Sequence, residues 1–247
     1  MRQIHVFPDE AVYAPGRVSA IVPVYGRKAG QLKQVLQDLS AQTAPDLEIL
    51  VVNNGIPEAD LAERLADYPT VKFLHLDRNY GAAYARNAGA LVSEGEYLWF
   101  VDSDLEHIPP RTAETAMGLL AASPTAGCIG GVFFPDRDRC SFVGGRLRID
   151  ADSAEAIAIH CRVDQFVNTA CLLIPKKLFF RINGFADYIE YPFDDVDFGY
   201  KLTSTGRRAL ADTRAAAFHP IHPMKNSIFG EFMSMHNLLV HLVINYT

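Results

Sequence analysis

The sequence has no apolar run long enough to cross a membrane. A spanning helix needs roughly 18 or more apolar residues, and no stretch of the 247 residues reaches that length. The nearest candidate, residues 237–246, is short and is interrupted by His241 and Asn245. Such a stretch is typical of a buried or interfacial helix. We therefore expect no transmembrane segment and leave peripheral association with a membrane open.

Cysteine is scarce, and the first residues do not predict a secretion signal. The four cysteines, at positions 128, 140, 161 and 171, show neither the paired spacing of a zinc site nor the density of a secreted disulfide scaffold. Pro8, Asp9 and Glu10 leave the N-terminal segment without the apolar core of a signal peptide. We expect reduced thiols in a cytoplasmic protein, with peripheral binding to the inner face of the membrane left open.

Positive charge is in deficit as well. The formal net charge is -6, so the chain has no global positive field to attract nucleic acid. We expect no nucleic-acid partner.

What the sequence does contain is an alternation of strands and helices. The apolar run over residues 18–24 predicts a buried strand, and Leu32, Val35, Leu36 and Leu39 follow at helical spacing. The pattern repeats, with strands expected over 47–52, 71–76 and 97–101 and helices over 61–65 and 81–92. Such alternation predicts an α/β fold in one domain: a mostly parallel sheet with helices on both faces.

The rhythm loosens after about residue 109. Residues 112–122 and 194–204 have helical patterns, and 176–182 suits a helical turn. Strands are expected around 128–134 and over 167–174, while 135–164 is irregular and polar. We expect a long loop over that polar stretch.

Polar residues follow each strand of the first half. In open sheets of this kind, ligands bind beyond the carboxyl ends of the strands. The residues at that edge should therefore converge in space, and they are Tyr25, Asn53, Asn54, Asn79, Asp102 and Asp104.

The Asp102-Ser103-Asp104 motif directly follows an apolar strand. Two carboxylates with one residue between them can bind a hard cation such as Mg²⁺, which proteins often share with substrate phosphates. The metal would offset charge on a departing nucleoside diphosphate. An isolated Asp-x-Asp is commonly a solvated turn or a helix cap, but the strand before it favours a metal site here.

A second acidic cluster occupies residues 194–197. Acidic residues at the start of a helix are favoured by the helix dipole, which is the structural interpretation. The functional interpretation makes Asp195 a general base that takes the proton from an acceptor hydroxyl.

Six motifs occur in an order that resembles family 2 of the GT-A glycosyltransferases, and the resemblance covers nearly the whole chain. They are residues 21–25, 51–55, 79–81 with 85–87, 100–104, 183–185 and 194–197. The resemblance implies a GT-A fold and an inverting, metal-dependent transfer of a sugar from a nucleoside-diphosphate sugar to an acceptor hydroxyl. It also implies a nucleotide-sugar-binding half over about 17–108 and an acceptor-binding half over about 109–247.

The resemblance assigns roles to particular residues. Those expected at the nucleotide sugar are Pro23, Val24, Tyr25, Asn53, Asn79, Arg86, Asp102 and Ser103. The expected metal ligands are Asp102, Asp104 and His219, with His222 as an alternative, and Asp195 matches the catalytic base. Asn53 stands where the family usually has a base-recognising Asp, and an amide can donate as well as accept. Arg86 also suits a surface position on its helix.

The sequence leaves several identities open. The metal is expected to be Mn²⁺ or Mg²⁺, and the donor a UDP-, dTDP- or GDP-sugar. The acceptor could be a saccharide, a lipid-linked glycan, a peptide or a small metabolite, and the oligomeric state is undetermined. Two alternatives remain: a non-catalytic nucleotide-sugar-binding scaffold or sensor, and a sugar nucleotidyltransferase. The latter needs a glycine-rich loop after the first strand, where residues 23–27 contain one glycine.

Overall fold

The structure is a computed structural model that describes residues 5–26, 31–136, 139–143, 161–164, 168–188 and 194–220. The first half contains the elements β1 (Ala14–Val24), α1 (Leu32–Ser40), β2 (Leu47–Asn54), α2 (Glu58–Leu65), β3 (Lys72–Leu76), α3 (Ala82–Val92) and β4 (Gly95–Val101). The second half contains α4 (Thr112–Ala122), β5 (Ala126–Gly130), β6 (Val132–Asp136), β7 (Arg139–Val143), β8 (Cys161–Asp164), β9 (Cys171–Pro175), α5 (Lys176–Arg181), α6 (Asp194–Ser204), β10 (Arg208–Asp212), the 3-10 turn Thr213–Ala215 and β11 (Ala217–Phe218).

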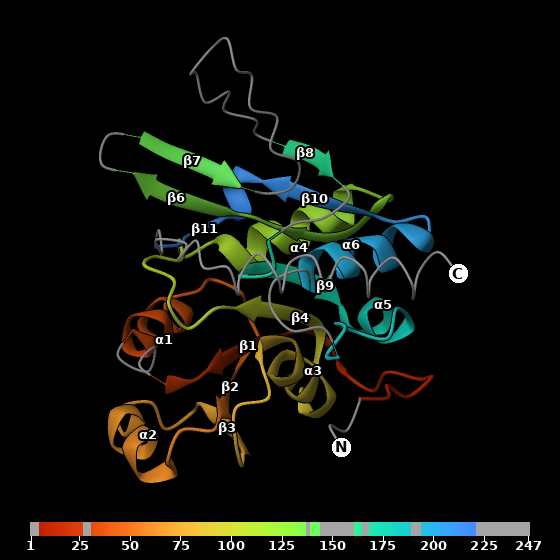
Figure 1. Ribbon diagram of the computed structural model, residues 1–247. Helices are drawn as coiled ribbons and strands as arrows, with labels where there is room; N and C mark the ends of the chain where they lie inside the picture. Colours follow the sequence, from red (N-terminus) through yellow and green to blue (C-terminus); the bar gives the residue numbers. More distant parts are fainter. Residues whose placement is uncertain are drawn as a thin grey trace, which may run out of the picture.

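The strands form one large sheet and one small one (Figure 1). The large sheet has eight strands in the order β3-β2-β1-β4-β9-β5-β10-β8, and the small sheet has the order β11-β6-β7. Strands β1 to β4 pair in parallel, as do β5 and β10, whereas β9 and β8 pair antiparallel with their neighbours. The expected α/β class with a mostly parallel sheet is confirmed.

Helices cover both faces of the large sheet, as the sequence predicted. One apolar cluster joins α1, α2 and α4 to alternate strand residues such as Val22 and Val24. The other joins α3, α5 and α6 to the intervening residues, among them Ile21 and Phe100. Burial on both faces is why residues 18–24 are apolar almost without interruption.

Helix α3 packs directly against the sheet at Gly89. A Cβ added at Gly89 would come 2.5 Å from a methyl carbon of Ile21 and 2.9 Å from one of Val52. A side chain at this position would force the helix away from β1 and β2. This close packing fixes the height of α3 above the strands, and with it the position of the residues on the first turns of the helix.

The second half differs from the sequence predictions in four places. The strand expected around 128–134 is two strands, because the chain turns at Gly131, whose φ is 147°. The strand expected over 167–174 begins at Cys171, and β10 was not predicted at all. Within the polar stretch 135–164, β7 and β8 form, and most of the remainder lies outside the described residues.

Two predictions concern residues near the end of the given sequence that the structure does not describe. The apolar segment 237–246 and His222 belong to residues 221–247, which the structure does not describe. Among the residues that it does describe, no helix combines the length and the hydropathy needed to span a membrane.

Candidate functional site

Three potential metal ligands meet beyond the carboxyl end of β4. Asp102, Asp104 and His219 each present one ligand atom, and these atoms lie within 4.8 Å of one another. The Asp102 side chain is 22% exposed, whereas Asp104 is fully buried. Asp102 and Asp104 follow the strand directly, but His219 arrives from more than a hundred residues away in the chain.

A short strand pairing brings His219 to this point. The backbone N–H of Glu106 donates to the Phe218 carbonyl at 2.8 Å, and the N–H of Phe218 donates to the His107 carbonyl at 2.8 Å. The segment after Asp104 therefore runs beside β11, and His219 is the next residue. Its Nε2 lies 3.9 Å from Oδ1 of Asp104.

The hydrogen bonding of His219 suits it to metal binding. Its Nδ1 lies 2.8 Å from the carbonyl oxygen of Pro220, and since a carbonyl only accepts, Nδ1 carries the hydrogen. In the neutral ring, the lone pair is then on Nε2, the atom that faces Asp104. Two carboxylates and one imidazole form a donor set that fits Mn²⁺ or Mg²⁺.

Arg86 joins this cluster to the first turn of α6. It lies on α3 and is 3% exposed. Its Nη2 donates to Oδ1 of Asp102 at 2.6 Å, and its Nη1 donates to Oδ2 of Asp194 at 3.0 Å. Burial lowers the pKa of the guanidinium and is the largest single influence, but the charges of Asp102, Asp194 and Asp195 together raise that pKa above its ordinary value.

Asn87, the next residue along α3, holds the chain between α5 and α6. Its side chain donates to the Phe185 carbonyl at 2.8 Å and accepts from the Phe185 N–H at 3.0 Å. Asn183 and Gly184 both adopt positive φ, 57° and 58°, to end α5 and make this approach. A Cβ at Gly184 would come 2.7 Å from Oδ1 of Asn87, so the position requires glycine.

The residues after β1 and β2 are arranged differently. Val24 is buried and Tyr25 is 43% exposed. The Asn53 side chain accepts from the Ile56 N–H at 2.8 Å and donates to the Ile56 carbonyl at 2.7 Å. Its Nδ2 also lies 3.1 Å from Nδ1 of His75. Asn53 thus builds the turn after β2, and most of its hydrogen-bonding capacity is used there.

Asn79 also has a structural task. Its Oδ1 accepts from Nδ2 of Asn54 and from the Gly81 N–H, both at 2.9 Å. A Cβ at Gly55 would come 2.5 Å from the Asn79 nitrogen, so the two loops pack directly against each other. This asparagine pair shapes the loop that leads into α3.

Several of the residues expected at this edge contact one another, and Asn53 pairs with Val24 where β2 and β1 end. Asp102, Asp104 and His219 come together, with Arg86 beside Asp102, while the asparagines 53, 54 and 79 form their own loop network. Ser103, which lies between the two aspartates in the sequence, is buried. The sequence did not predict that Asp194 binds Arg86. The position of Asp194 next to Asp195 was the signal that could have indicated a role in the site.

More than half of the chain matches the model of one protein family. The family model described as Glycosyl transferase family 2 matches residues 19–156, more than half of the chain.

The chain belongs to glycosyl transferase family 2. Among relatives of this family member, the protein named "Uncharacterized glycosyltransferase" from Haemophilus influenzae is 27% identical over 190 residues, which are 75% of this chain and 61% of that protein. The Escherichia coli protein named "Uncharacterized glycosyltransferase YibD" is 36% identical over 104 residues, which are 41% of this chain and 29% of that protein. The chain thus spans less than two thirds of either relative.

Solved structures share the fold of this family 2 chain. The mannosyltransferase PcManGT from Pyrobaculum calidifontis, in complex with GDP-Man and Mn²⁺, matches 98% of this chain and 67% of its own, with a TM-score of 0.65 and 19% identity. GalNAc-T7, crystallised with UDP, GalNAc and Mn²⁺, matches 96% of this chain and 52% of its own, with a TM-score of 0.70 and 14% identity. The likeness supports the GT-A fold predicted from the sequence.

Proposed function

We propose that this protein transfers a sugar from a nucleoside-diphosphate sugar to an acceptor hydroxyl, with inversion at the anomeric carbon and with the help of a divalent metal ion. The observation that carries the proposal is the convergence of Asp102, Asp104 and His219 at the carboxyl end of the parallel strands. Open α/β sheets bind their ligands at this edge. Family membership provides the reaction type, and the cluster provides the chemistry.

Asp104 and His219 are the proposed direct ligands of the metal, and Asp102 binds either the metal or the ribose of the donor. When bound, Mn²⁺ or Mg²⁺ supplies a positive charge that offsets the negative charge of the leaving nucleoside diphosphate. The hydrogen bond from Nδ1 of His219 to the Pro220 carbonyl holds the imidazole in the required tautomer and orientation.

The donor is proposed to be a UDP-, dTDP- or GDP-sugar. Two structures of this fold support a nucleotide-sugar site, since one is a complex with GDP-Man and the other contains UDP. Tyr25, which is partly exposed beside the end of β1, is proposed to contact the base with its ring. Asn53, whose side chain hydrogen-bonds to the backbone of Ile56, is proposed to lie beside the base as well.

Asp195 is the proposed general base. It is half-buried in the first turn of α6, and it directly follows Asp194, which accepts a hydrogen bond from Arg86. A carboxylate there can accept the proton of the acceptor hydroxyl as the oxygen attacks the sugar. The acceptor would approach from the half formed by residues 109–247.

Donor binding provides the test. Thermal unfolding would be followed with UDP-, GDP-, dTDP- and CDP-sugars, each with and without Mn²⁺, because a ligand that binds only the folded state raises its stability. We expect one base to give a metal-dependent rise. Asp104→Asn should abolish the rise, whereas Asp67→Asn, at a carboxylate with a 73% exposed side chain, should leave it unchanged. No rise with any donor in the wild-type protein would refute the proposal.

A further inference from the structure

The bridge made by Arg86 connects two parts of the site that lie far apart in the sequence. One partner, Asp102, directly follows β4 in the proposed donor half, and the other, Asp194, begins α6 in the proposed acceptor half. Each carboxylate receives a separate N–H group of the same planar guanidinium. A change in the position of either carboxylate must therefore be accommodated at the other.

Arg86 itself has little freedom to move. It stands on α3, which Gly89 allows to pack directly on β1 and β2. Its Cζ lies 5.6 Å from the centre of the Phe185 ring, and the backbone of Phe185 is in turn held by two hydrogen bonds with the Asn87 side chain. Burial removes competing water, which strengthens the two charge-assisted hydrogen bonds.

One atom of Arg86 shows that the side chain is not placed for maximal hydrogen bonding. Its buried Nε has no hydrogen-bond partner among the described residues. Leaving a buried donor unpaired is unfavourable, so the two bonds to Asp102 and Asp194 determine where the guanidinium lies.

We infer that Arg86 is a positioning residue with two separable effects. Its geometry holds α6, and therefore Asp195, in register with Asp102. Its charge lies against a proposed metal-binding carboxylate and weakens metal binding in the absence of donor, because like charges repel across a partly buried site. This inference rests on the proposed function and adds to it a coupling between the metal site and the base helix.

Two substitutions separate charge from geometry. Arg86→Lys retains the positive charge but lacks the planar fork that serves two carboxylates. Arg86→Met removes the charge and retains much of the apolar bulk. The affinity for Mn²⁺ without donor is measured from the electron paramagnetic resonance signal of free Mn²⁺, and turnover is measured at saturating donor and Mn²⁺.

The expected results differ for the two variants. Arg86→Met should bind Mn²⁺ about tenfold more tightly than the wild type, since a repelling charge is gone, and should lose turnover. Arg86→Lys should bind Mn²⁺ within about twofold of the wild type while its turnover falls at least about tenfold. Structural damage alone would weaken metal binding and would not tighten it. Wild-type turnover in Arg86→Lys, or unchanged or weaker Mn²⁺ binding in folded Arg86→Met, would overturn the inference.

Asp194→Ala, which removes the acceptor of Arg86 Nη1, tests the bridge from its other end and covers the case in which Arg86→Met does not fold. It leaves the bond between Arg86 and Asp102 in place, so donor affinity with Mn²⁺ should stay near the wild-type value while turnover falls about tenfold or more. Full turnover would contradict the inference. A wild-type protein without Mn²⁺-dependent donor binding would instead refute the proposed function, so the two failures are distinguishable.

Discussion

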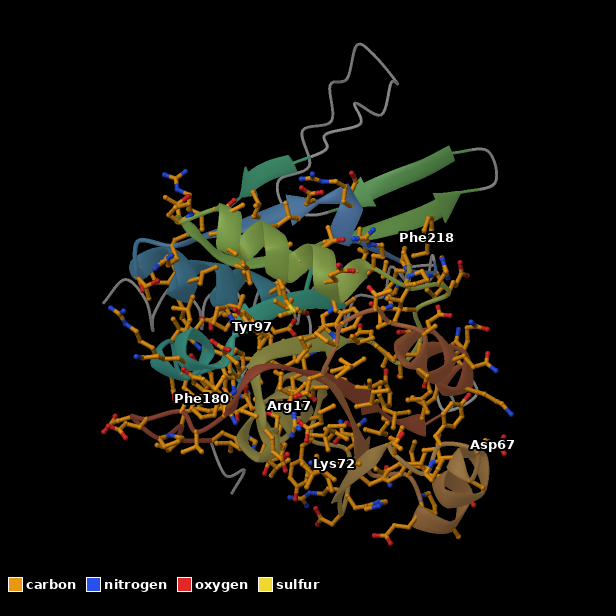
Figure 2. All side chains as sticks on the ribbon, turned by 180° about the vertical axis from the view of Figure 1, so that it is seen from behind. Arg17, Asp67, Lys72, Tyr97, Phe180 and Phe218 are labelled. Carbon is orange, nitrogen blue, oxygen red and sulfur yellow. The ribbon has the colours of Figure 1, made fainter. Side chains whose placement is uncertain are left out.

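Two charged clusters lie at opposite ends of the parallel strands, and their partners are distributed differently. The basal network lies at the amino ends of β1 to β4 and includes Arg17, Ser19, Glu48, Lys72 and Glu94. In Figure 2, its residues Arg17 and Lys72 lie in the lower part of the molecule, whereas Phe218, next to His219 of the other cluster, lies in the upper part. Glu48 is the buried centre of the basal network. It accepts hydrogen bonds from the Ser19 hydroxyl, from the Glu94 N–H at 2.9 Å and from Lys72 Nζ at 2.8 Å.

At the carboxyl ends, one guanidinium is shared by two carboxylates. Arg86 serves Asp102 and Asp194, and Asp102 also belongs to the cluster with Asp104 and His219. In the basal network, one carboxylate instead receives three donors. A buried acid surrounded by donors stabilises the fold, whereas acids that gather around few donors create a place for a cation.

The largest expected effect comes from the proposed base. Asp195→Asn keeps the shape of the side chain but cannot take a proton, so turnover should fall by about a hundredfold or more. Donor affinity with Mn²⁺ should be unchanged. Product formation and calorimetric donor binding measure the two quantities. Glu58→Gln, at a side chain that is 74% exposed, is the control, and full activity of Asp195→Asn would remove Asp195 from its role.

Loss of a proposed metal ligand should come next. Asp104→Asn replaces a buried carboxylate with a neutral amide, and we expect affinity for Mn²⁺ to fall at least about tenfold, the size of loss that even outer-shell changes cause. Mn²⁺ titration in the presence of nucleoside diphosphate measures it. Unchanged affinity would place the metal elsewhere and would remove the contrast between the two ends of the sheet.

The basal network should affect stability and leave transfer intact. Glu48→Gln loses the charge that faces Lys72, and the free energy of unfolding should fall by roughly 2 kcal/mol. Urea unfolding measures this change, and turnover per folded molecule should be that of the wild type. Glu114→Gln, which alters the exposed pair with Arg111, should give no measurable change in stability. A turnover defect in Glu48→Gln would show that the two ends of the sheet are coupled.

The smallest expected effect is the loss of the stabilisation by Glu48 at acidic pH. Burial raises the pKa of Glu48 and is the largest single influence, but the hydrogen bonds from the Glu94 backbone, Lys72 and Ser19 together hold that pKa below its ordinary value of 4.5. A lowered folded-state pKa means that this stabilisation is present above the unfolded pKa and disappears as the pH falls through the folded one. The stability difference between wild type and Glu48→Gln should therefore shrink from about pH 6 to about pH 3.5. A constant difference would contradict it.

Much of the fold could be predicted from residue patterns. The helices 112–122 and 194–204 have the predicted bounds, because their apolar spacing and flanking residues are local signals. The strand β10 was not predicted, since its five residues, Arg208–Asp212, carry no alternation or long apolar run. Its position between β5 and β8 depends on hydrogen bonding to strands distant in the chain.

Residue patterns predicted only part of the candidate site. Asp102 and Asp104 could be singled out because an apolar strand runs directly into them. The asparagines 53 and 79 were expected to face a nucleotide, which stays a prediction. What the sequence did not indicate is that their side chains also hydrogen-bond within the neighbouring loops, because such bonds depend on the position of nearby backbone groups.

By itself, the sequence determined the alternation of strands and helices, the edge of the sheet at which polar residues gather, and the family motifs in their order. These are local properties, set by side-chain periodicity and by the residues that end each strand. Only the tertiary structure decided that β11 would lie beside the segment after Asp104 and bring His219 to it, and that Arg86 would join Asp102 to Asp194. Such contacts depend on backbone hydrogen bonds and close helix packing between distant segments, which no local pattern specifies.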